Sequence, residues 1–222
     1  MSAMPSWTLV SVHIPKTAGT SLGAMLHAHF GDMLKADYDD RPLSRPRWTR
    51  RIQALRHALA HAGERSQAAC IHGHFLPLKY ASMRGMRYST WLRDPVQRVL
   101  SRYHHYQRHA SDEPQHARWG LVPGLSLADF VRLPQYRDTC AEYLWAFPLR
   151  RFEFVGIVED HASELSRFAR QFELTVADGL ARHNRNPEKA GTRYAVEPAM
   201  DRLIRRLNAR DVALYEAALA RR

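Results

Sequence analysis

A strand-turn-helix junction near the amino terminus constrains the fold of this chain more than any other feature. The apolar run Leu9 to Val12 predicts a buried strand, and the next ten residues, HIPKTAGTSL from His13 to Leu22, predict a tight turn and the start of a helix. The first N–H groups of a helix have no partners within it, and the helix dipole adds positive potential at the same place. We therefore expect this turn to bind an anion of the phosphate type.

The order of residues within the turn indicates which kind of anion site it is. The phosphate loop of nucleotide triphosphatases reads G-x-x-x-x-G-K-[ST], with two glycines before the lysine and a magnesium-binding hydroxyl after it. Here the only glycine of the turn, Gly19, follows Lys16, which disfavours an ordinary ATP or GTP site. The positive charge, the hydroxyl groups and the small residues of the turn give these candidate anion-binding residues: Lys16, Thr17, Ala18, Gly19, Thr20 and Ser21.

A second strand-helix junction lies in the middle of the chain. Residues 88–92 (YSTWL) predict a buried strand, and an amphipathic helix follows Arg93-Asp94-Pro95. Asp94 suits the N-cap of that helix and Pro95 its first position. Arg93 should then lie at the carboxyl end of the strand, and Ser101 about two turns into the helix.

A pair of histidines follows another predicted strand. Residues 68–75 (AACIHGHF) place His72 and His74 two residues apart, and so on one side if the strand continues. An imidazole with a pKa near about 6.5 is a suitable general base at physiological pH. Two other interpretations stay open, namely a zinc site with two histidine ligands and a structural role at the strand end.

Both junctions resemble motifs of one enzyme family. The segment P-K-T-A-G-T-S, residues 15–21, resembles the 5′-phosphosulfate loop of sulfotransferases that use 3′-phosphoadenosine 5′-phosphosulfate (PAPS). The segment LRDPVQRVLSRYHHY, residues 92–106, resembles their 3′-phosphate motif. The resemblance implies that PAPS is the donor, that 3′-phosphoadenosine 5′-phosphate (PAP) is the product, and that Arg93 and Ser101 hold the 3′-phosphate. It also implies that Lys16 takes part in catalysis and that no metal is required.

The His-Gly-His segment resembles one branch of that family, the glycan 2-O-sulfotransferases of the heparan sulfate and uronyl types. This likeness implies that His74 is the catalytic base and that the acceptor hydroxyl belongs to a carbohydrate or glycan. His13 stands where the heparan enzyme carries an arginine near its acceptor, so His13 and His72 are expected to lie on the acceptor side. Relatives often cover the cofactor with a loop at the position of Lys189, Gly191, Thr192 and Arg193.

The remaining pattern predicts a single α/β domain spanning residues 1–222. Apolar strands separated by helices imply a central parallel sheet flanked by helices, a P-loop-like three-layer fold with ligands at the carboxyl ends of the strands. Residues 152–158 predict a further strand, after which Glu159-Asp160 begin a helix rather than supply a magnesium ligand. Residues 111–149 read as an acceptor-side region with a helix from Cys140 to Phe147.

Charge limits the choice of partner less than the motifs do. The chain has 33 basic and 22 acidic residues, a formal net charge of +11, which suits a polyanionic donor, an acidic glycan or nucleic acid.

Two cysteines make no disulfide framework, and no signal pattern or apolar span of membrane length is present, so we expect a cytoplasmic, bacterial-like minimal form. Two alternatives remain, a metal-dependent P-loop nucleotide kinase or NTPase and a basic nucleic-acid-binding protein without catalysis.

Overall fold

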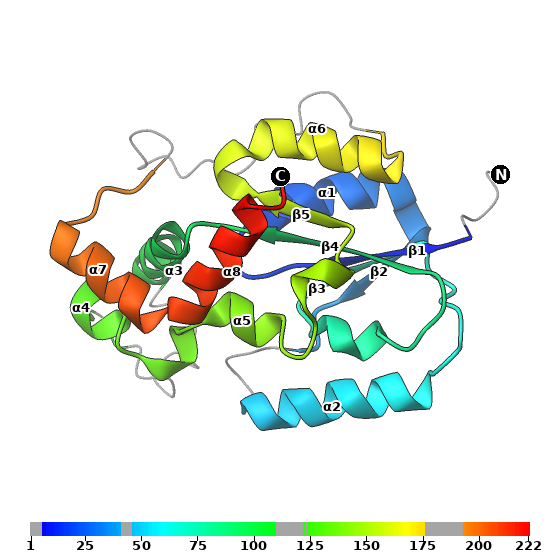
Figure 1. Cartoon of the computed structure of the whole chain (residues 1–222), viewed down its shortest axis with the longest axis horizontal. Helices are drawn as coiled ribbons and strands as arrows, with labels where there is room; N and C mark the ends of the chain where they lie inside the picture. Colours follow the sequence, from blue (N-terminus) through cyan, green and yellow to red (C-terminus); the bar gives the residue numbers. More distant parts are fainter. Residues whose placement is uncertain (1–5, 41–45, 110–121, 123, 176–192) are drawn as a thin grey trace.

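The sheet at the centre of the molecule is entirely parallel (Figure 1). The computed structural model describes residues 6–40, 46–109, 122, 124–175 and 193–222. In these ranges the five strands are β1 (Thr8–Val12), β2 (Leu34–Asp37), β3 (Cys70–Gly73), β4 (Met86–Leu92) and β5 (Phe154–Ile157). Their order in the sheet is β2-β3-β1-β4-β5. The predicted α/β class with a central parallel sheet is therefore confirmed.

Helices cover both faces and the carboxyl edge of the sheet. They are α1 (Gly19–Phe30), α2 (Arg47–Ala60), α3 (Pro95–His109), α4 (Leu127–Phe130), α5 (Thr139–Tyr143), α6 (His161–Phe172), α7 (Pro198–Leu207) and α8 (Ala209–Leu219). Short 3₁₀ turns join several of them, namely η1 (Gly31–Met33), η2 (Pro77–Tyr80), η4 (Pro134–Tyr136), η5 (Leu149–Arg151) and η6 (Val158–Asp160). Within the described ranges, none of these helices has the length and apolar character needed to cross a bilayer.

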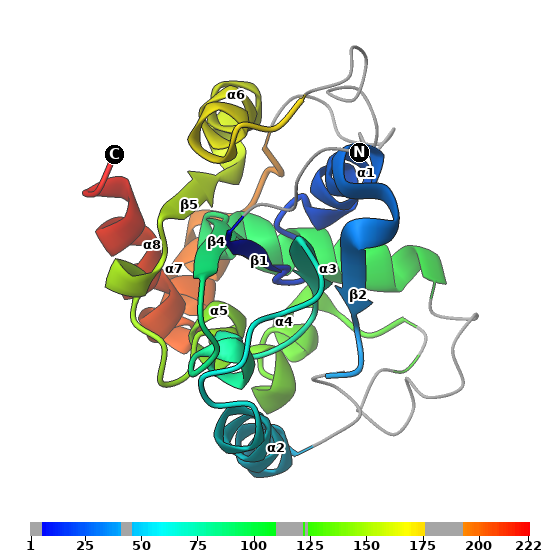
Figure 2. The same ribbon diagram turned by 90° about the vertical axis from the view of Figure 1, so that its right-hand side faces the viewer.

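Side-chain alternation along the strands divides the core between the two faces of the sheet. Leu9 packs with apolar residues of α1 and α6, whereas Val10 and Val12 pack with those of α5 and α8. Figure 2 shows α1 and α6 together above the sheet and α5 below it. The result is a layer of helices on either side of a buried sheet, as predicted.

The central position of β1 brings three predicted segments to one edge. Val12 pairs with Gly73 of β3 on one side and with Thr90 of β4 on the other. Because all strands are parallel, the loops after β1, β3 and β4 leave the sheet at the same edge. This carboxyl edge is where α/β sheets bind their ligands.

The structure corrects three sequence predictions about elements. Strand β2 is absent from the prediction, because it is a four-residue edge strand, LKAD, with no apolar run, and Lys35 and Ala36 are exposed. The predicted strand over 152–158 is shorter, since η5 and η6 flank β5. The predicted helix over 140–147 ends at Tyr143, and Ala146 adopts a left-handed φ of 57° that no α-helix continues through.

A buried ion pair joins the carboxyl-terminal helices to the rest of the fold. The Asp211 carboxylate on α8 lies 3.3 Å from the Arg98 guanidinium of α3, and the two side chains are 1% and 3% exposed. The same carboxylate accepts hydrogen bonds from the backbone amides of Cys140 at 3.1 Å and Ala141 at 2.9 Å. Asp211 therefore connects α3, α5 and α8.

Replacing Asp211 tests this connection. Asp211→Ala leaves a buried arginine uncompensated, and we expect the free energy of unfolding to fall by about 3–5 kcal/mol. Urea denaturation measures it. The matched control is Asp201→Ala, which removes a partly exposed pair with Arg205 and should change stability by less than about 1 kcal/mol. Equal effects of the two variants would contradict the assigned role.

Candidate functional site

The loop between β1 and α1 has a strained backbone. Lys16 and Ala18 adopt φ values of 70° and 62°, in the left-handed region that residues with a Cβ seldom occupy. Thr17 between them is buried, and its hydroxyl donates to the carbonyl oxygen of Ile14 at 2.8 Å. Ala18 occupies the N-cap position of α1, and its side chain makes no capping hydrogen bond. Ala18 therefore offers no side-chain acceptor to the amides of the first turn of α1, a position where a helix binds anions.

Positive charge is concentrated around this loop. Burial, together with the nearby charges of Arg102, Arg108 and Arg93, lowers the pKa of Lys16 to about 8. Arg93 follows β4 directly, and its guanidinium Nη1 donates to the Lys16 carbonyl oxygen at 3.4 Å. Like charges are brought together at a cost in folding free energy, and an anion bound among them offsets that cost.

The start of α3 is built as predicted. Asp94 Oδ1 accepts a hydrogen bond from the Gln97 amide at 3.1 Å, which confirms Asp94 as the N-cap, and Pro95 is the first helical residue. Glu159 Oε1 accepts from the Asp94 amide at 3.1 Å, and its Oε2 accepts from the Tyr215 hydroxyl at 3.0 Å. Glu159 thus supports the turn that carries Arg93, and η6 and α6 begin at this point, in agreement with the helix-start interpretation.

The structure describes some of the remaining predicted donor-binding residues and not others. Ser101 lies in α3, partly exposed, next to Arg102, and Thr20 and Ser21 lie in the first turn of α1. Arg193 is described, and its guanidinium lies 3.7 Å from the carboxylate of Asp94, the residue that follows Arg93. Three members of the predicted covering loop fall outside the described residues: Lys189, Gly191 and Thr192.

Three imidazole rings lie together at the carboxyl edge of the sheet, and we call them the histidine stack, although the His13 and His74 rings are tilted by 39° to each other. His13 occupies the middle, with ring centroids 4.3 Å from His74 and 5.3 Å from His72. His72 is 3% exposed, and its Nδ1 lies 2.9 Å from the Ser11 hydroxyl oxygen. Strand β3 ends at Gly73, so His74 leaves the sheet and is only partly buried. The sequence therefore predicts the pair at the end of a strand but does not reveal that His13 separates the two rings.

Hydrogen bonding fixes the tautomer of His74. Its Nδ1 lies 2.5 Å from the His13 carbonyl oxygen, which can only accept, so Nδ1 carries the proton and Nε2 keeps its lone pair. Burial lowers the pKa of His74, and the Arg102 charge acts in the same direction, while the hydrogen bond to His13 opposes both. A neutral imidazole with a lone pair on Nε2 is the form that a general base requires.

Gly19 brings the loop between β1 and α1, which we call the cationic loop, into contact with the histidine stack. A Cβ built on Gly19 would come within 1.9 Å of the His13 ring, so the absence of a side chain at this position makes room for His13. Burial, together with His74, His72 and Lys16, lowers the pKa of His13 to about 2, so the ring in the middle of the stack stays neutral.

Several residues of the site are absent from the sequence prediction. Tyr38 follows β2, is 39% exposed, and its ring centroid lies 4.9 Å from that of His74. Arg102 and Arg108 belong to a helix, residues 95–109, that contains three arginines and no acidic residue, and this composition is the signal that could have found them. Tyr38 carries no such signal, because the sequence does not reveal β2 either.

The Nδ1 atoms of the three histidines are engaged with oxygen atoms of the protein. The His13 and His72 rings are nearly parallel, 12° apart, and each of the three Nδ1 atoms lies near a separate oxygen, on Tyr38, Ser11 or His13. Across the ranges that the structure describes, no group of three or more His, Cys, Asp and Glu side chains has the geometry to hold a metal ion.

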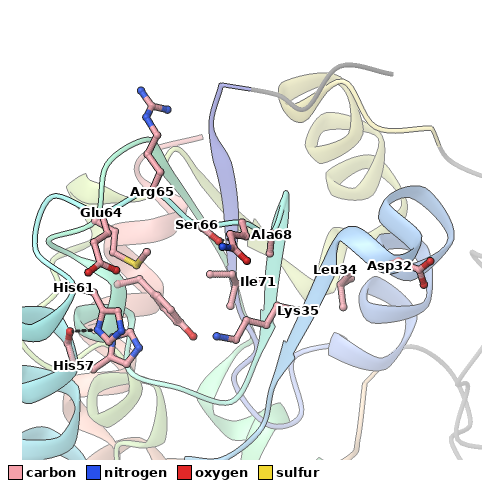
Figure 3. A pocket seen from close by; sticks show the side chains of 13 residues that line it. Asp32, Leu34, Lys35, His57, His61, Glu64, Arg65, Ser66, Ala68 and Ile71 are labelled. Atoms are coloured by element: carbon pink, nitrogen blue, oxygen red, sulfur yellow. Dashed lines mark hydrogen bonds between the residues drawn. The ribbon is translucent and has the colours of Figure 1, made fainter. Parts of the chain in front are cut away.

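A separate cavity lies at the other end of the sheet. It has a volume of about 550 Å³ and is lined by residues at the amino ends of β2 and β3 and by the end of α2, including Leu34, Ala68, His57 and His61 (Figure 3). No residue of the cationic loop or of the histidine stack lines it. The candidate site is therefore the cationic loop with its histidine stack, not this cavity.

Comparison with solved structures finds sulfotransferases among the matches. One is the sulfotransferase from Alicyclobacillus acidocaldarius, 15% identical with a TM-score of 0.49, and the match covers 96% of this chain and 95% of that one. Another is the sulfotransferase domain from the curacin biosynthetic pathway, 10% identical with a TM-score of 0.41, covering 90% and 83%. No family model and no curated protein sequence matches the chain. At these identities and TM-scores the likeness carries no functional conclusion, which must come from the residues of the site.

Gly19→Ala tests the coupling of the loop and the stack. The added methyl group displaces the His13 ring, and we expect the imidazole NMR resonances of His13 and His74 to shift while the sheet stays folded. Gly31→Ala serves as the control. Its Cβ meets no atom within 4 Å, but its φ of 51° makes the substitution cost about 1 kcal/mol of stability without moving the histidines. Unchanged histidine resonances in Gly19→Ala would refute the coupling.

Proposed function

We propose that this protein is a sulfotransferase that transfers a sulfuryl group from PAPS to an acceptor hydroxyl. One observation carries the proposal: the charges of Arg93, Arg102 and Arg108 act on Lys16 at a strained helix N-terminus, and His74 lies at the same edge of the sheet with a lone pair on Nε2. The first feature suits a donor with several phosphate-type groups. The second suits removal of a proton from the acceptor.

The residues of the loop fit the donor. The first-turn amides of α1 and the Lys16 ammonium group would hold the 5′-phosphosulfate, because N–H groups and cations bind such oxygens with charge-assisted hydrogen bonds. Arg93, with Arg193 near the same turn, would hold the 3′-phosphate at the start of α3. Ser101, one helix position before Arg102, would add a hydroxyl group to the same subsite.

The transfer step needs a base and stabilisation of charge. His74 Nε2 would take the acceptor proton as the acceptor oxygen forms its bond to sulfur and the bond from sulfur to the phosphate oxygen breaks. Lys16 would stabilise the negative charge that develops on that leaving oxygen. By analogy with phosphoryl transfer, positioning and electrostatics dominate such a reaction, so the fixed tautomer of His74 and the fixed loop supply most of what is needed.

The acceptor is proposed to be a hydroxyl of a carbohydrate or glycan. The support is the His-Gly-His segment and the exposed ring of Tyr38, which lies beside His74 and offers a flat surface to a sugar ring. His13 and His72 would act from behind, holding His74 in place, since His72 is buried and His13 is held between the other two rings.

Replacing His74 tests the base. We expect His74→Ala to lower kcat by about 10²- to 10⁴-fold while the affinity for PAP is retained. The assay is transfer from radiolabelled PAPS to a panel of saccharides, glycolipids and phenols in the presence of EDTA. Because burial lowers the pKa of His74, the wild-type rate should stay constant as the pH falls through about 6.5 and decline only below it.

His27→Ala is the comparison variant, since His27 is an exposed histidine on α1. It should transfer at the wild-type rate. Full turnover by His74→Ala would remove the general-base assignment, and absence of transfer to every acceptor, with hydrolysis of ATP instead, would overturn the proposed reaction.

The pKa of Lys16 predicts how donor binding depends on pH. Lys16 loses its proton above about pH 8, so the Kd for PAP measured by calorimetry should rise above that pH, by up to about tenfold per pH unit. The phosphates of the nucleotide are already ionised there, with pKa values near about 6. Lys16→Arg keeps its charge and should show a flat profile. The same pH dependence in both proteins would show that Lys16 is not the titrating group.

A further inference from the structure

Helix α2 exposes an apolar face that no described element covers. Trp48, Ile52, Leu55 and Leu59 are 65%, 40%, 42% and 78% exposed, and they make up four of the seven large hydrophobic side chains that are exposed in the described chain. At 3.6 residues per turn the four fall within an arc of about 60°. We call them the α2 apolar stripe.

The opposite side of α2 attaches the helix to the protein. Arg50, Ala54 and Ala58 are buried, and His57 Nδ1 lies 2.9 Å from the Lys79 carbonyl oxygen in η2. Figure 1 shows α2 as the outermost helix on its side of the molecule. The stripe therefore points away from the core and is not needed to hold the helix in place.

The charge around the stripe is positive. Residues 47–60, RWTRRIQALRHALA, contain four arginines and no acidic residue. Arg51 and Arg56 flank the stripe, about 40° from it on either side. The Glu142 carboxylate is shared by Arg47 at 3.3 Å, Arg51 at 2.7 Å and Arg210 at 2.9 Å, so three guanidinium groups face one carboxylate.

These features fit one kind of partner. A single convex helix with an apolar stripe, a tryptophan and flanking arginines has the character of a helix that lies in a lipid interface. The exposed Arg56 side chain can reach an anionic headgroup while the stripe enters the acyl boundary, whereas Arg51 is held by Glu142. A second copy of the chain would place arginines against arginines along the same face, which opposes pairing.

We propose that α2 docks this protein on an anionic lipid surface through the α2 apolar stripe and the adjacent Arg56. Such docking is independent of the proposed function. Helix α2 contributes Arg50 to the neighbourhood of His74 through its buried side, whereas the stripe lies on the other side.

Vesicle sedimentation with the full chain tests the proposal. We expect the protein to sediment with vesicles of phosphatidylcholine and phosphatidylglycerol, and much less with phosphatidylcholine alone. The double variant Trp48→Gln with Leu59→Gln should partition about tenfold less or weaker still, since both side chains are among the most exposed and their loss should not affect folding. Arg56→Gln should weaken binding to the anionic vesicles only. Circular dichroism and the Kd for PAP should be unchanged in all of them.

Leu219→Gln is the matched control, because Leu219 is 41% exposed on α8, outside the stripe, and it should bind vesicles like the wild type. Three results would overturn the proposal: no sedimentation of the wild type, equal sedimentation of the double variant, or a concentration-dependent dimer that the double variant abolishes without any vesicle binding. The last would assign the stripe to a second copy of the chain.

Discussion

The concentration of positive charge at the loop after β1, where Lys16 is partly buried near three arginines, is the constraint on which the rest of the site depends. Burial of the ammonium group lowers the pKa of Lys16, and Arg102, Arg108 and Arg93 all act in the same direction. Such an arrangement weakens the free protein and is typical of functional sites. The fold supplies it through parallel strands: β1 and β4 are neighbours, so the loop after β1 and the helix after β4 meet at one edge. We propose that the ligand of this edge is an anion with more than one phosphate-type group.

The second constraint is the contact between Gly19 and His13. It links the loop after β1 to the three imidazoles, so the group that would bind the donor lies next to the ring that contacts the group that would accept the proton. His13 is neutral because burial and its neighbours lower its pKa, and its carbonyl oxygen sets the tautomer of His74. His13 thus contacts Gly19 of the loop through its side chain and fixes the tautomer of His74 through its backbone carbonyl oxygen.

The parts of this site that local chemistry determines could be predicted from the sequence. The N-cap of α3 at Asp94 follows from a short-range preference, and so does the position of Arg93 at the end of β4. The edge strand β2 could not be predicted because four residues without an apolar run carry no periodic signal, and Tyr38 was missed with it. The place of His13 between His72 and His74 depends on the parallel pairing of β1 with β3 and on the space that Gly19 leaves. Both are long-range features that no short stretch of sequence encodes.

The central claim is that the cationic loop is a site for a nucleotide with a 3′-phosphate and a 5′-phosphate-type group, and calorimetric titration tests it most directly. PAP should bind the wild type in EDTA with a stoichiometry of one. Arg93→Ala and Arg102→Ala should each weaken that binding by about tenfold or more, because each variant removes a cation that stabilises the bound phosphates. ATP with magnesium should bind much more weakly. Tight binding of ATP with magnesium, together with no heat from PAP, would contradict the account.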